Sequence, residues 1–114
     1  MIDREIQELV FVLKKIGIET IASCEGHLGS DFHTNFPWVA FYPNNLDFLK
    51  DIIKEYNENK LSEERWEVSF SRVLKEKPVY LLKPKHDYKD IHYLQEQSFN
   101  LKNYLKEIPP RSYF

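Results

Sequence analysis

The sequence predicts an α+β fold for a single domain spanning residues 1–114. Amphipathic helical patterns alternate with pairs of short strand patterns, in the order helix, strand, strand, helix, strand, strand, helix. Because strands that follow one another usually pair as neighbours, we expect a four-stranded, largely antiparallel sheet covered by three helices. A chain of 114 residues is long enough to bury a hydrophobic core of its own.

Three segments have the apolar periodicity of helices. Residues 3–16 place apolar side chains at i, i+3, i+4 and i+7, and Gly17 supplies a left-handed stop. A second helix is predicted over residues 46–57, with Asn45 as its N-cap. The last helix is predicted to start after Asp87 and to end at a pair of prolines.

Strands are predicted over residues 18–23, 38–42, 65–71 and 78–83. In the third of these, apolar and polar side chains alternate, so one face is expected to be core and the other wet or functional. The aromatic residues at core-compatible positions are Phe41, Phe48, Tyr56, Trp66 and Phe70.

The composition excludes several classes of protein. A chain that is 42% hydrophobic and 15% aromatic is not intrinsically disordered. No apolar run approaches the roughly 20 residues that cross a bilayer, so we expect no membrane partner. The first residues lack the apolar segment of a signal peptide, and a lone cysteine forms no internal disulfide, so the expected compartment is the cytoplasm.

The net charge of −2 hides an asymmetry along the chain. Residues 1–71 hold 7 Lys/Arg and 13 Asp/Glu, whereas residues 72–114 hold 9 Lys/Arg and 5 Asp/Glu. This balance does not indicate that the whole protein is attracted to nucleic acid, but it allows a local basic face in the second part of the chain.

One stretch gathers the residue types that carry chemistry. Residues 20–41 hold the only cysteine, two of the four histidines and two of the three glycines. The candidate catalytic residues are Cys24, Glu25, His27 and Asp31. The candidate ligand-binding residues are Ser23, Gly26, Gly29, Lys83 and Lys85. Cys24 comes at the end of a predicted strand, and the glycines after it let the backbone approach a ligand closely.

Three interpretations of Cys24 stay open. Together with His27 and His33 it can provide three protein ligands to zinc and leave a fourth position for water, as catalytic zinc sites do. A second pair of ligands is absent from the sequence, so a closed structural zinc finger is not expected. Without a metal, a thiolate beside His27 can act as a nucleophile, with Glu25 or Asp31 orienting the imidazole. Alternatively, Cys24 is a packed strand residue.

The motif Ser-Cys-Glu-Gly-His resembles the Ser-Ser-Cys-Ser-Gly-Arg motif at a strand end in the wybutosine-synthesis tRNA methyltransferase family. The matching residues are Ser23, Cys24 and Gly26. The residues that depart from the family's motif are Ala22, Glu25 and His27. The resemblance implies an α+β fold and a nucleotide-like or S-adenosylmethionine-related ligand. The motif is also similar to one in short prokaryotic or phage proteins of unknown function.

Two functions from different classes follow from these residues. The first is a ligand-binding or catalytic site at residues 24–27 that acts on a small molecule, a nucleotide or a nucleic acid. The second is a non-catalytic module that binds nucleic acid or protein through the basic residues 72–89. In that segment Lys83 and Lys85 can contact phosphates and His86 can stack on a base, although a solvated hairpin explains the same lysines. The sequence does not decide whether the protein is an enzyme.

Overall fold

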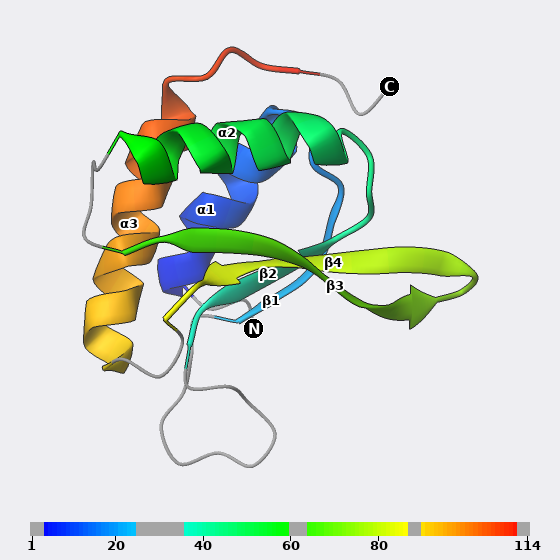
Figure 1. Ribbon diagram of the computed structural model, residues 1–114, viewed down its shortest axis with the longest axis horizontal. Helices are drawn as coiled ribbons and strands as arrows, with labels where there is room; N and C mark the ends of the chain where they lie inside the picture. Colours follow the sequence, from blue (N-terminus) through cyan, green and yellow to red (C-terminus); the bar gives the residue numbers. More distant parts are fainter. Residues whose placement is uncertain (1–3, 25–35, 60–63, 87–89, 112–114) are drawn as a thin grey trace.

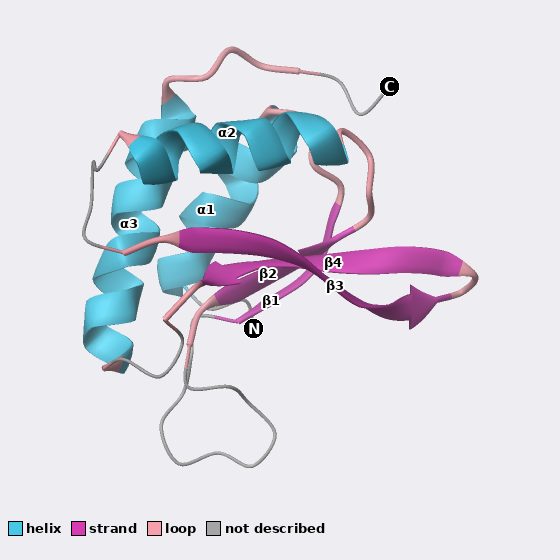
Figure 2. Cartoon of the chain, viewed as in Figure 1, coloured by secondary structure: helices cyan, strands magenta, loops and turns pink. Residues whose placement is uncertain are grey.

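The computed structural model describes residues 4–24, 36–59, 64–86 and 90–111, and its elements follow the predicted order (Figure 1). The helices are α1 (Arg4–Lys15), α2 (Leu46–Glu58) and α3 (Ile91–Lys106). The strands are β1 (Thr20–Cys24), β2 (Trp38–Phe41), β3 (Trp66–Leu74) and β4 (Lys77–Pro84). The described strands form one antiparallel sheet in the order β1-β2-β4-β3, shown in magenta in Figure 2. The predicted α+β class and antiparallel sheet are confirmed.

The three helices pack on one face of this sheet, and Figure 1 shows them gathered on that side. Successive strand residues point to opposite faces, so Val39 and Phe41 of β2 and Leu82 of β4 face the helices together. They join the apolar stripes of α1, α2 and α3 in a single hydrophobic cluster. Trp66, at the start of β3, is the largest fully buried side chain in that cluster.

The predicted helix ends are only partly correct. Gly17 ends the α1 segment with φ 90°, as predicted for a left-handed stop. Asn45 does precede α2, but its φ is 62° and its side chain makes no capping hydrogen bond. Its Nδ2 instead donates to the carbonyl of Gly17, 2.8 Å away, and so ties the start of α2 to the end of α1. The cap of α3 is Asp90, which accepts from two backbone N–H groups in the first turn. Asp87 lies outside the described residues.

The β3–β4 hairpin is longer than predicted. β3 continues to Leu74, beyond the predicted end at residue 71, and a two-residue turn of Lys75 and Glu76 leads into β4. Both turn residues have positive φ, 51° and 67°. Turns of this kind usually use Asn or Gly, so a Lys-Glu pair gave no sequence signal for the turn.

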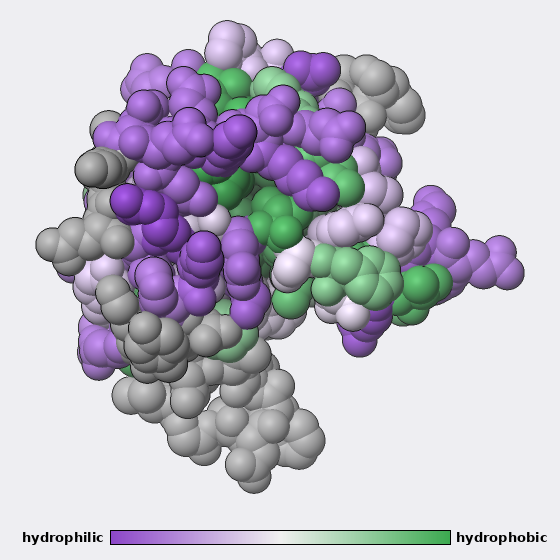
Figure 3. Space-filling view, viewed as in Figure 1, coloured by the Kyte–Doolittle hydropathy of each residue, from purple (hydrophilic) through white to green (hydrophobic). Residues whose placement is uncertain are grey.

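The far part of this hairpin extends beyond the helical layer, and hydrophobic side chains are visible along it in Figure 3. The assignment of Phe70 to the core is wrong, because its side chain is 58% exposed. It packs edge-on against Tyr80 of the neighbouring strand and does not belong to the core cluster. The pairing shifts by one residue between Phe70 and Arg72, which moves Arg72 to the face opposite the helices.

The other four aromatic residues assigned to the core, Phe41, Phe48, Tyr56 and Trp66, are in it or packed against it.

Candidate functional site

The face of the sheet opposite the helices, the open face, carries a groove of about 380 Å³. In β2 the alternation that turns Val39 and Phe41 inward turns Trp38 and Ala40 outward, and both line this groove. The other main lining residues are Phe36, Arg72, Val79 and Leu81. No described helix residue lines the groove, so strand side chains and Phe36 form its described walls.

Aromatic rings and cations lie together on the open face. The ammonium nitrogen of Lys83 is 5.3 Å from the ring centroid of Phe36 and 3.4 Å from a carboxylate oxygen of Glu67. Lys77, at the other end of β4, lies over the ring of Tyr42 at 5.2 Å. A cation in this position is attracted by the electron-rich face of the ring. The exposed Arg72 adds a further positive charge directly on the groove wall.

Cys24 is the last residue of β1, as the sequence predicts, and it is only 3% exposed. Its register partner is Trp38, so the residues on either side of 25–35 meet at one end of the sheet, beside the groove. Ser23 pairs with Val39 and is partly buried. The remaining predicted site residues in this stretch lie outside the described residues: Glu25, Gly26, His27, Gly29, Asp31 and His33.

A metal site is not found in the part of the chain that the structure describes, where no three His, Cys, Asp or Glu side chains are grouped to hold an ion. Two of the three predicted zinc ligands, His27 and His33, fall outside that part. The zinc site therefore stays a prediction.

The two predicted ligand-binding lysines reach the same end of the sheet as Cys24. Lys83 is partly buried between Phe36 and Glu67. Lys85 is exposed, and its backbone N–H donates to the carbonyl of Arg65 at 2.7 Å, which extends the β3–β4 ladder beyond the strands. The structure thus brings Lys83 to the groove residue Phe36, because the end of β4 lies beside the start of β2, and Lys85 follows two residues later at the same end of the sheet.

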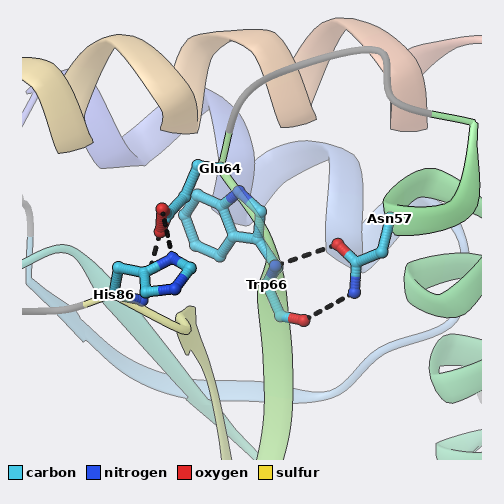
Figure 4. Close-up of polar contacts among 4 residues, drawn as sticks. All are labelled: Asn57, Glu64, Trp66 and His86. Carbon is cyan, nitrogen blue, oxygen red and sulfur yellow. Dashed lines mark hydrogen bonds and ion pairs between the residues drawn. The ribbon is translucent and has the colours of Figure 1, made fainter.

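A carboxylate–histidine pair that was not predicted from the sequence lies at this end of the sheet (Figure 4). Glu64 is completely buried; one of its oxygens accepts from the backbone N–H of His86 at 3.1 Å, and the other lies 3.0 Å from Nδ1 of the His86 ring. A signal was present, since the alternation that turns Trp66 and Val68 inward also turns Glu64 inward. This carboxylate thus holds Nδ1 of His86, and the stacking of the His86 ring on a base stays a prediction.

A second polar contact in Figure 4 secures the outer edge of β3. The side-chain amide of Asn57, in the last turn of α2, donates to the Trp66 carbonyl at 2.9 Å and accepts from the Trp66 N–H at 3.0 Å. These two bonds occupy the backbone groups that an edge strand would otherwise offer to another chain.

Comparisons with known proteins give no relative of this chain: no protein-family model, curated protein or solved structure matches it. The resemblance of residues 23–27 to the wybutosine-synthesis methyltransferases therefore stays a prediction.

Among the described residues, none of the helices combines the length and the apolar character needed to span a bilayer.

Proposed function

We propose that the protein is a non-catalytic module that binds single-stranded nucleic acid on the open face of its sheet. One observation carries this proposal: Phe36, Trp38 and Arg72 line one groove, and Lys83 lies directly over the Phe36 ring. Flat aromatic side chains stack on unpaired bases of any sequence, and neighbouring cations attract the phosphates that connect those bases.

The shape of the site favours single strands over duplexes. A volume of about 380 Å³ is in the range of pockets that enclose small ligands, and the lining is mainly apolar, with Ala40, Val79 and Leu81 among the lining residues. Such a recess accepts a base that is turned out of a stack. A duplex is instead read by an element that enters one of its grooves, whereas this site is a recess in the face of the sheet.

The dependence of affinity on salt tests the proposal. If Arg72 and Lys83 neutralise two phosphates, the slope of log K against log salt is about −1.4, and affinity falls about sevenfold between about 50 and 200 mM salt. The measurement is the fluorescence anisotropy of a labelled oligouridine or oligothymidine of about 12 nucleotides. Arg72→Gln is expected to make the slope shallower by about 0.7.

The matched control is Lys106→Gln, which removes an exposed cation from α3, on the helical side of the sheet. We expect this variant to keep the affinity and the slope of the unsubstituted protein. Failure of the oligonucleotide to bind, or an equal loss of slope in both variants, would contradict binding on the open face.

We also propose, as a second candidate, a chemical site at residues 24–33. It is favoured by the register of Cys24 opposite Trp38, which puts the start of this segment beside the groove. Cys24, His27 and His33 would hold zinc there, and zinc would activate a water molecule. Elemental analysis of the purified protein is then expected to find one zinc per chain, and Cys24→Ala to lose it. Carefully prepared protein without zinc, or zinc retained by Cys24→Ala, would exclude this site.

A further inference from the structure

A second recess lies in the helical layer, on the outer side of α1 and α3. These two helices pack side by side (Figure 1), and a groove of about 440 Å³ runs between them. The lining residues that matter here are Glu8, Phe11, Val12, Lys15, Lys102 and Lys106. None of them belongs to the sheet, so this groove is separate from the open face.

Two large apolar side chains are exposed on these helices: Phe11, which lines the groove, and Phe99, which lies beside the lining residue Lys102. Phe11 of α1 is 70% exposed and Phe99 of α3 is 51% exposed. Lys102 connects the two helices, since its ammonium nitrogen is 4.2 Å from the centroid of the Phe99 ring and 3.3 Å from a carboxylate oxygen of Glu8. Exposed apolar side chains bordered by charged ones are typical of surfaces that bind another protein.

The charges around the groove select the kind of partner. Lys15, Lys102 and Lys106 face a single acidic lining residue, Glu8, so the lining carries a net charge of +2. A second copy of this chain placed groove to groove would bring two positive rims together, which is unfavourable. The complementary partner is an acidic one.

The length of the groove matches a short helix. The lining residues of α1 extend from Gln7 to Lys15, and those of α3 are Lys102 and Lys106. The α1 residues span eight residue steps, or about 12 Å of helix, which is about two turns, and the two α3 residues lie about one turn apart. A partner helix of two turns would place apolar residues at i, i+3, i+4 and i+7 along this length.

We propose that the groove between α1 and α3 binds an acidic amphipathic helix of a partner protein. The apolar side of that helix packs on Phe11, Val12 and Phe99, and its carboxylates pair with Lys15 and Lys106. The inference does not depend on nucleic-acid binding, because the residues of the two surfaces do not overlap.

The probe for this proposal is a labelled peptide of leucine and glutamate, with leucine at i, i+3, i+4 and i+7. We expect it to bind the full chain, and a peptide of the same composition with scattered leucines, or with lysine in place of glutamate, not to bind. Replacing Phe11 and Phe99 together with serine is expected to weaken binding at least about tenfold. Replacing Lys15 and Lys106 with glutamate is expected to transfer the preference to the lysine peptide.

The matched control is the pair Phe36→Ala and Trp38→Ala on the open face, which should leave peptide affinity unchanged. The proposal is overturned if the glutamate peptide does not bind, or if it binds the Phe11 and Phe99 variant as well as the unsubstituted chain. Two further results would overturn it in favour of another occupant. One is self-association of the chain that Phe11→Ser abolishes, and the other is a preference for vesicles of anionic phospholipid over the peptide.

Discussion

Alanine at both Phe36 and Trp38 is expected to weaken the binding of a single-stranded oligonucleotide at least about 30-fold. Stacking of one base on an aromatic side chain contributes at least about 1 kcal/mol, so two stacked bases contribute about 2 kcal/mol. Both side chains line the groove of the open face, while neither belongs to the core cluster that holds the helices on the sheet. The measurement is the dissociation constant by fluorescence anisotropy at one fixed salt concentration.

The control for this experiment is a second pair of aromatic side chains. Phe11 and Phe99 are exposed on the helical layer, and their replacement by alanine should leave oligonucleotide affinity unchanged. Thermal unfolding of both double variants establishes that each remains folded. If the two pairs reduce affinity equally, or if the open-face pair has no effect on a folded protein, the oligonucleotide does not bind in the groove.

Glu64→Ala is expected to lower the free energy of unfolding by roughly 1–3 kcal/mol, the cost of leaving buried polar groups without their partners. Glu64 is completely buried and contacts both the backbone and the ring of His86, which follows β4. Its removal therefore takes away the side-chain contact between the residues before β3 and those after β4, while the backbone bond from Lys85 to Arg65 remains. Because total stabilities are about 5–15 kcal/mol, urea unfolding should detect this loss easily.

Glu67→Ala is the matched control. Glu67 lies three residues after Glu64 and forms a partly exposed ion pair with Lys83. Such pairs contribute about 0–1 kcal/mol, so the control should lose much less stability. A double-mutant cycle with His86→Ala separates the ring contact from the backbone contact. Equal losses for Glu64→Ala and Glu67→Ala would show that the buried pair is not what holds this end of the sheet.

The element order could be predicted because its signals are local. Apolar periodicity located the helices, alternation located the strands, and Gly17 marked the first helix end. The exposure of Phe70 does not depend on local sequence. Alternation places Phe70 on the face that the helices cover, but the hairpin continues beyond the helices. The length of that hairpin depends on a Lys-Glu turn, whose residues carry no turn signal.

The site was less predictable than the fold, since it depends on pairing between distant residues. Alternation alone indicates that Trp38 faces away from Phe41, but only the order β1-β2-β4-β3 brings it to the same groove as Arg72. Likewise, alternation indicates that Glu64 points inward, but it does not identify the residue that Glu64 contacts. His86 becomes that partner because of the register of β3 and β4, which sequence patterns did not establish.

Tryptophan fluorescence tests most directly the claim that bases stack in the groove. The chain has two tryptophans, Trp38 in the groove and the buried Trp66 in the core. In a Trp66→Phe variant, the emission of Trp38 should be quenched as oligonucleotide is added, with the dissociation constant found by anisotropy. In Trp38→Phe, the emission of Trp66 should stay constant. An oligonucleotide that binds Trp66→Phe while the emission of Trp38 does not change would contradict the proposed function.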